Sequence, residues 1–266
     1  TYYDTLTSTV GCDSLVVLIL SVDNCAFGSF ASAPYIGTCS NNSVSSGFYN
    51  TTGTGVDLIG TNTFTGANLG TYIQNSNYLV LNGAEVKTFK TVTANVCGAT
   101  MYYTIYLQGS RPANPVFTAV PLPFFDNCGG STFPTGGPCS PGDQKWQKAN
   151  LNLDLTVRPP GNYVIEVYYQ VVGDDNSTSA CTDTLYVNNS GGNYTADFSI
   201  VSPPTISYSP STFCTTVSTP QPVNLSAFAG GTFSATPAGL NINSTTGSIT
   251  PSLSTPGTYT VKYVFD

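Results

Sequence analysis

The chain has 266 residues, of which only 8% are charged and none is histidine, and its formal net charge is −7. Without histidine it lacks the side chain that most often transfers protons near neutral pH and most often binds metals. Its seven basic residues are scattered, so no stripe of positive charge could follow a phosphate backbone and nucleic acid is not expected as a partner. No apolar run is long enough to cross a membrane, and we expect no membrane insertion.

Short apolar or alternating segments follow one another along the chain, with 26 glycines and 18 prolines between them as turn residues. Only residues 143–149 suggest a helical turn. This pattern is typical of an all-β sandwich or barrel. The clearest expected strands cover residues 15–20, 78–81, 101–107, 151–157 and 163–172.

Two short sequence motifs recur. Residues 256–261 (Pro-Gly-Thr-Tyr-Thr-Val) resemble residues 160–165 (Pro-Gly-Asn-Tyr-Val-Ile), and residues 11–17 (Gly-Cys-Asp-Ser-Leu-Val-Val) resemble residues 180–187. The opening Thr1-Tyr2-Tyr3 looks like the first motif without its glycine. We therefore expect each domain to end in a tyrosine-bearing strand, a turn and a cysteine-led final strand, as in arrays of similar β domains.

This repetition predicts three domains. Residues 1–23 would be the last two strands of a truncated Ig-like repeat, and residues 24–202 one large disulfide-bearing β-sandwich. Residues 203–266 would be an Ig-like repeat that lacks its final strand. The predicted fold is therefore a tandem of Ig-like or jelly-roll-like β-sandwich domains, truncated at both ends.

The eight cysteines contain no CxxC pair, which argues against zinc and iron–sulfur sites and favours disulfides formed in an oxidising compartment. Cys12 and Cys214 fall in the truncated domains, so we expect their partners outside the chain. The other six allow fifteen connectivities, among which sequence does not choose. A short Gly/Pro-rich loop favours one pair, and the full expected set is Cys128 with Cys139, Cys25 with Cys39, and Cys97 with Cys181.

The carboxylates are the only plausible catalytic groups. A glycosidase needs two of them roughly 5–10 Å apart across the scissile bond. The only glutamates are Glu85 and Glu166, and Glu166 alternates with apolar residues in a predicted strand, which predicts a solvent-facing position. A nucleophilic serine or cysteine would have no histidine base. We therefore assign no catalytic residue and do not expect an enzyme.

Two places could bind a ligand. Asp174, Asp175, Asn176 and Asp183 form the best candidate for a calcium site, because Ca²⁺ prefers carboxylate and amide oxygens. An acidic turn between two strands explains these residues equally well. Trp146, the only tryptophan, lies in a polar stretch and could stack on a sugar ring, or it could be buried under a loop.

Residues 2–18 resemble the end of a repeat that is common in very large surface proteins of Bacteroidota. Residues 231–242, continuing through 246–249 to 256–259, resemble a second such repeat. These repeats occur in gliding-motility adhesins and related filamentous proteins exported by the type IX secretion system. The resemblance implies Ig-like sandwiches, a cell-surface or extracellular location, and adhesion or appendage building, with no catalytic residues to transfer.

Two hypotheses follow. The leading one is a structural or adhesive segment of a giant extracellular surface protein or filament that attaches to cells or surfaces. Its partners would be neighbouring domains of the same polypeptide, further copies in a filament, and a glycan or cell-surface receptor. The alternative is a carbohydrate-binding module in residues 24–202, which would use Trp146 and loop tyrosines, together with Ca²⁺ at Asp174 and Asp175.

Overall fold

The computed structural model describes residues 2–7, 13–18, 26–40, 43–129, 140–175, 180–226 and 230–264. These residues form β-strands joined by turns and three short 3-10 helices, so the expected all-β fold is confirmed. The strands belong to two large sheets and three two-stranded sheets.

The first large sheet has the strand order β10-β11-β7-β3-β4-β5, with β12 also pairing β7. Its long central strands, β3 and β7, run antiparallel along most of their length. The short strand β5 is parallel to β4. The strands are β3 (Phe27–Ser40), β4 (Ser43–Asn50), β5 (Asn62–Thr63), β7 (Leu79–Lys90), β10 (Phe124–Asn127), β11 (Gln144–Lys148) and β12 (Leu153–Asp154).

The second large sheet has the order β6-β15-β13-β8-β9, with β14 also pairing β13. The first half of β13 pairs with β15 and the second half with β14, while β8 pairs along its other edge. The strands are β6 (Ala67–Ile73), β8 (Asn95–Leu107), β9 (Thr118–Leu122), β13 (Gly161–Asp174), β14 (Asp183–Val187) and β15 (Tyr194–Val201).

The two large sheets share one hydrophobic core. Alternate side chains of a strand lie on the same face, and in β13 the residues Ile165, Val167 and Tyr169 are fully buried on the inner face. They belong to one cluster with Leu81 and Val86 of β7. Strands β3 to β15 therefore form a sandwich, called here the central unit (residues 26–201).

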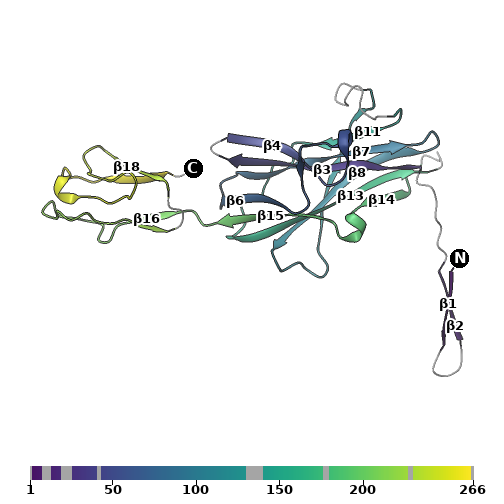
Figure 1. Cartoon of the computed structure of the whole chain (residues 1–266), viewed down its shortest axis with the longest axis horizontal. Coiled ribbons are helices and arrows are strands. Elements are labelled where there is room, and N and C mark those ends of the chain that lie inside the picture. The colour runs from purple at the N-terminus through teal and green to yellow at the C-terminus, as the bar shows by residue number, and fades with distance from the viewer. Residues whose placement is uncertain are drawn as a thin grey trace.

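Four short strands form the C-terminal unit (residues 205–264). β16 (Thr205–Ser207) pairs with β17 (Asn224–Ser226), and β18 (Thr232–Thr236) pairs with β19 (Thr260–Val264). The buried hydrophobic side chains found here are Phe233 and Ile249. The unit follows directly after β15 (Figure 1).

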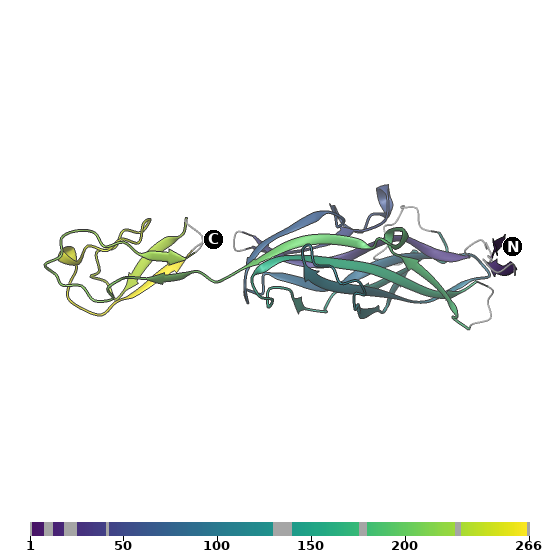
Figure 2. The same ribbon diagram turned by 90° about the horizontal axis from the view of Figure 1, so that it is seen from below.

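At the other end of the chain, β1 (Tyr2–Thr7) and β2 (Asp13–Leu18) form an antiparallel pair with Tyr2 opposite Leu18. Figure 2 shows the C-terminal unit beyond one end of the central unit and β1–β2 beyond the opposite end.

Two expected elements are wrong. The helical turn expected at residues 143–149 is strand β11, which is held in the sheet because it pairs with β7 on one edge and β10 on the other. The strand expected at residues 151–157 is reduced to the two residues of β12. Pairing with neighbouring strands, which a local pattern does not encode, decides both cases.

Candidate functional site

Cys97 in β8 and Cys181, just before β14, form the disulfide expected for these two residues, with their Cα atoms 6.0 Å apart. The bond therefore joins β8 to the chain segment that leads into β14, and both strands pair with β13. Cys128 is also disulfide-bonded. Cys139, its expected partner, lies outside the described residues, as do Cys12 and Cys25.

Cys39 is a free thiol, so the expected pair with Cys25 is wrong. The reason is geometric. Cys25 comes two residues before Phe27 in the sequence, where β3 begins, and Cys39 lies near the end of the same strand. Twelve residues of extended chain span roughly 40 Å, far beyond the Cα separation that a disulfide allows. Cys214 is also free, and it is exposed; a partner outside the chain stays a prediction.

Glu166 does not face solvent as expected, since it is only 1% exposed on the outer face of the second sheet. Arg111 reaches over it and donates two hydrogen bonds of 2.7 Å, one to each carboxylate oxygen. Tyr106 donates a third bond of 2.8 Å, and the side chain of Asn193 donates a fourth of 2.6 Å. Arg111 and Asn193, which lie in loops, therefore cover a position that strand alternation alone predicts to be exposed to water.

These four donors determine the ionisation of Glu166. Burial by itself would raise the pKa of Glu166, but the hydrogen bonds from Arg111, Asn193 and Tyr106 outweigh it, so the pKa is lowered. A carboxylate with a lowered pKa and four bound donors remains ionised and does not donate a proton. The geometry thus assigns Glu166 to holding the loops that carry Arg111 and Asn193.

Glu85 is buried on the outer face of the first sheet. Gln147 donates a bond of 2.7 Å to it, and the Lys145 ammonium lies 3.8 Å away. Burial raises the pKa of Glu85, and the nearby Lys145 and Lys87 only partly offset this. The side chains of Glu85 and Glu166 leave opposite faces of the sandwich, so they cannot act together across one glycosidic bond.

The acidic residues after β13 bind backbone groups. Asp175 accepts a 3.0 Å bond from the Ala26 amide, and Asp183 accepts one of the same length from the Asp175 amide. Asp174, which is 1% exposed, accepts from the Ala180 amide at 3.2 Å. This is the geometry of the acidic turn between strands. Within the described residues no group of three His, Cys, Asp or Glu side chains could hold a metal, and Asn176 lies outside them.

The sugar-stacking interpretation of Trp146 is wrong. Its side chain is only 7% exposed and belongs to the core of the central unit. The indole Nε1 donates a 3.1 Å hydrogen bond to Thr88, and Phe124 packs edge-on against the ring. Because Trp146 lies opposite Val86 of β7 and shares its inner face, the ring is buried in the core and is not available for stacking on a ligand.

No sequence pattern indicated the aromatic cluster on the outer face of the second sheet. The rings of Tyr102 and Tyr168 stack with centroids 4.8 Å apart, and Phe117 packs edge-on at 4.9 Å. Tyr186 lies 6.3 Å from Tyr168 and is 54% exposed. Gln170 accepts a hydrogen bond from Tyr102. Strand alternation in β13 would have placed Tyr168 outward, but the partners come from three other segments.

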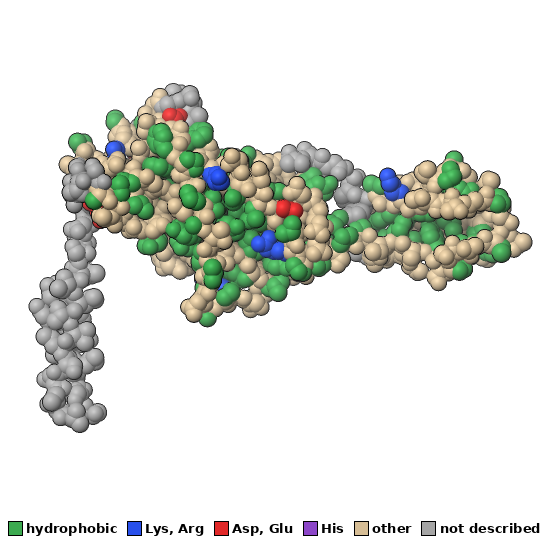
Figure 3. All heavy atoms as spheres, turned by 180° about the vertical axis from the view of Figure 1, so that it is seen from behind, with side chains coloured by type: hydrophobic (Ala, Val, Ile, Leu, Met, Phe, Trp, Pro, Cys, Tyr) green, Lys and Arg blue, Asp and Glu red, His purple; other side chains and the backbone are tan. Residues whose placement is uncertain are grey.

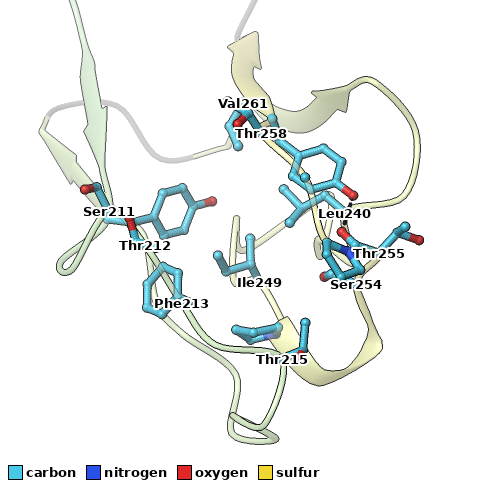
Figure 4. A pocket seen from close by; sticks show the side chains of 15 residues that line it. Ser211, Thr212, Phe213, Thr215, Leu240, Ile249, Ser254, Thr255, Thr258 and Val261 are labelled. Carbon is cyan, nitrogen blue, oxygen red and sulfur yellow. Dashed lines mark hydrogen bonds between the residues drawn. The ribbon is translucent and has the colours of Figure 1, made fainter.

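The C-terminal unit contains an open apolar groove of about 390 Å³, lined mainly by the loop segments 208–215 and 249–259. Figure 3 shows hydrophobic side chains in a band along this unit, between polar rims. In Figure 4, Phe213, Ile249 and Leu240 come from different segments and point toward the same space. The main apolar side chains of the lining are Tyr208, Phe213, Leu240, Ile249, Pro251, Tyr259 and Val261.

Hydrogen bonds hold the walls of this groove in place. Tyr208 donates its hydroxyl to the carbonyl of Gly247, and Tyr259 donates to the carbonyl of Thr255. Both tyrosine rings can therefore present apolar faces to the groove while their hydroxyls are satisfied. Cys214 lies between two lining residues, Phe213 and Thr215. No sequence signal predicted this groove.

Comparisons with protein-family models, curated proteins and solved structures found no match to this chain. In the part of the chain that the structure describes, no helix is long and apolar enough to cross a membrane.

Proposed function

We propose that this chain is a structural or adhesive segment of a giant extracellular surface protein or filamentous appendage, built from tandem Ig-like β-sandwich domains. The observation that carries the proposal is the C-terminal unit. It follows the central unit end to end, yet it leaves an apolar groove open, lined mainly by its loops. We infer that this unit is one repeat of an array in which neighbouring units pack against one another.

The state of the charged groups supports a role without catalysis. The two buried glutamates are tied to loop and strand side chains, and the acidic turn after β13 binds backbone amides. The Cys97–Cys181 disulfide favours an oxidising, extracellular compartment. The resemblance of both chain ends to repeats of Bacteroidota surface proteins favours export by the type IX secretion system.

The test has two parts. Small-angle scattering of the purified chain should give an elongated particle, because the units follow one another along one axis. Antibodies raised against the central unit should label intact cells of the source organism, and electron microscopy should locate the label on a surface filament or layer. A compact particle, or labelling only after the cells are opened, would refute the proposal.

A second candidate function is glycan binding by the central unit, and the aromatic cluster favours it. Tyrosine rings combine an apolar face with a polar edge, which suits a sugar surface, and Tyr186 is more than half exposed. A glycan array should detect binding by the wild type that Tyr168→Ala and Tyr186→Ala abolish. Tyr78→Ala is the matched control, because Tyr78 is 48% exposed but precedes β7 of the other sheet. Silence of the wild type on a broad array would remove this candidate.

A further inference from the structure

The lysine that ends β7 contacts an amide side chain rather than a carboxylate. Lys90 is the last residue of β7 and Asn95 is the first residue of β8. The Lys90 Nζ donates a 3.2 Å hydrogen bond to the Asn95 Oδ1. Among the residues that the structure describes, no carboxylate forms an ion pair with Lys90. The contact therefore brings an amine nitrogen next to a carbonyl group, the kind of group that a lysine nucleophile attacks.

The surroundings of this lysine–amide pair hold it in place. The turn between β7 and β8 is anchored by the Thr91 amide, which donates a 2.7 Å hydrogen bond to the carbonyl of Ala26. The Asn95 Nδ2 donates to the Cys97 Sγ at 3.7 Å, and that sulfur is fixed by its disulfide to Cys181. The amide is thus held with its oxygen toward the lysine. Holding reacting groups at contact distance in one orientation removes much of the barrier to a bimolecular reaction.

A buried carboxylate lies opposite the amide. Asp174, the last residue of β13, pairs in register with Asn95 and is only 1% exposed. Side chains of directly opposite residues in an antiparallel pair share one face, with Cβ atoms about 4.5–5.5 Å apart. The Asp174 Oδ2 accepts a 3.2 Å hydrogen bond from the Ala180 amide, which orients the carboxylate. A carboxylate shielded from water beside a reacting pair can accept a proton and later return it.

We propose that Lys90 and Asn95 form an intramolecular isopeptide bond, with Asp174 as the group that transfers the proton. Asp174 takes one proton from the Lys90 ammonium, and the neutral Nζ attacks Cγ of Asn95. Asp174 returns the proton to Nδ2, the Cγ–Nδ2 bond breaks and ammonia leaves. The Nζ keeps one hydrogen and releases its last excess proton to water. An ammonium and a carboxamide thus become an amide, one ammonia and one proton, without an oxidant or cofactor.

The bond would connect the two large sheets, because β7 belongs to the first sheet and β8 to the second. Cys97 follows Asn95 by two residues, so the isopeptide bond and the Cys97–Cys181 disulfide would lie close together in the central unit. The disulfide is broken by thiol reductants, whereas an amide is not. The inference goes beyond the proposed function and does not depend on it.

Mass spectrometry of the intact chain, after reduction and alkylation of its cysteines, is the first test. The wild type should be lighter than its sequence by the mass of one ammonia. A protease that cuts after lysine should leave residues 88–145 as one peptide, because an acylated Lys90 is not cleaved. Fragmentation of this peptide should locate the bond between Lys90 and Asn95. The Cys97–Cys181 bond, mapped in an unreduced sample, shows that the chain is folded.

Three variants test the assigned roles. Lys90→Arg keeps the positive charge and the hydrogen-bond donors but lacks the amine nucleophile, so it should have the full mass of its sequence. Asp174→Asn keeps the size of the side chain but removes the proton acceptor, and it should also keep its ammonia. Lys148→Arg is the matched control, because Lys148 is another half-buried lysine at the end of a strand. It should show the same mass loss as the wild type.

The wild-type mass decides the question even if a variant fails to fold. A folded wild type with the full mass of its sequence, or cleavage after Lys90, would overturn the inference. An ammonia loss that persists in Lys90→Arg would also overturn it, because that loss would then come from a cyclic imide at an asparagine. A bond that still forms in Asp174→Asn would overturn the role given to Asp174. The elongated shape and surface location of the proposed function are tested by their own measurements.

Discussion

The central unit and the C-terminal unit are built from the same kinds of residues but bury them very differently. In the central unit, β13 is paired along both edges and its inner side chains, such as Ile165 and Tyr169, are fully buried against the opposite sheet. In the C-terminal unit, β19 is paired along one edge and its side chains alternate between exposed and half-buried.

The difference shows what completes a sandwich. Apolar residues become buried only when a second layer covers them and each strand edge finds a partner. Ile249 and Phe233 have such cover, whereas the groove beside Val261 remains open. The contrast predicts that the central unit is stable on its own strands and that the C-terminal unit depends on what fills its groove.

The largest effect should come from removal of the Cys97–Cys181 disulfide. The bond closes a loop of 84 residues, so Cys97→Ser with Cys181→Ser should lower the free energy of unfolding of the central unit by about 4 kcal/mol. Urea unfolding followed by Trp146 fluorescence measures this. Cys39→Ser, which removes a free thiol, should cost less than about 1 kcal/mol. Equal losses in both variants would contradict the prediction.

A matched pair of core substitutions should separate the two units next. Ile165→Ala removes a fully buried side chain between two complete layers and should cost about 3 kcal/mol, because the neighbours cannot close the cavity. Ile249→Ala should cost only about 1 kcal/mol in the C-terminal unit, since the cavity would merge with the groove. Hydrogen exchange followed by mass spectrometry resolves the two units. A similar cost in each would show that the groove is filled in solution.

The two buried glutamates should respond differently to loss of charge. Glu166→Gln should cost about 2 kcal/mol at pH 7, because the ionised form binds Arg111, Asn193 and Tyr106. The folded-state pKa of Glu166 lies below the ordinary value of 4.5, so its stabilisation is present above that value and is lost as the pH falls below it. The difference between variant and wild type should therefore shrink in acid.

Glu85→Gln is the control for this pH dependence. The folded-state pKa of Glu85 lies above 4.5, so folding favours its neutral form, and that stabilisation is present at low pH and lost as the pH rises through the raised pKa. At pH 7 its substitution should consequently cost less than that of Glu166. Denaturant unfolding of both variants across the acidic range measures the contrast. A larger loss for Glu85→Gln would show that the Arg111 contact contributes little.

The smallest effect concerns calcium. Asp174, Asp175 and Asp183 accept hydrogen bonds from backbone amides, so adding Ca²⁺ or a chelator should shift the melting temperature of the central unit by less than about 1 °C. Asp175→Asn tests the same site from the protein side. A calcium-dependent rise of several degrees that this substitution removes would instead establish a metal site after β13.

Much of the fold could be predicted from local sequence patterns. The alternation in residues 163–172 identified the inner face of β13, and the dispersed cysteines indicated disulfides, one of which joins Cys97 to Cys181. Local patterns did not predict which side chains a ligand could reach. Trp146 is buried and Glu166 is covered by Arg111, because segments distant in sequence pack over them.

Periodicity, turn residues and repeated motifs therefore specified an all-β chain with tyrosine-bearing and cysteine-led strands, since strand formation follows from neighbouring residues. Exposure, ionisation and the open groove depended on long-range packing. A side chain on the outer face of a strand is exposed only if no loop covers it. An apolar face of a sheet is buried only if a second layer packs against it. For this reason the same kinds of strands close the core around Ile165 and leave the space beside Val261 open.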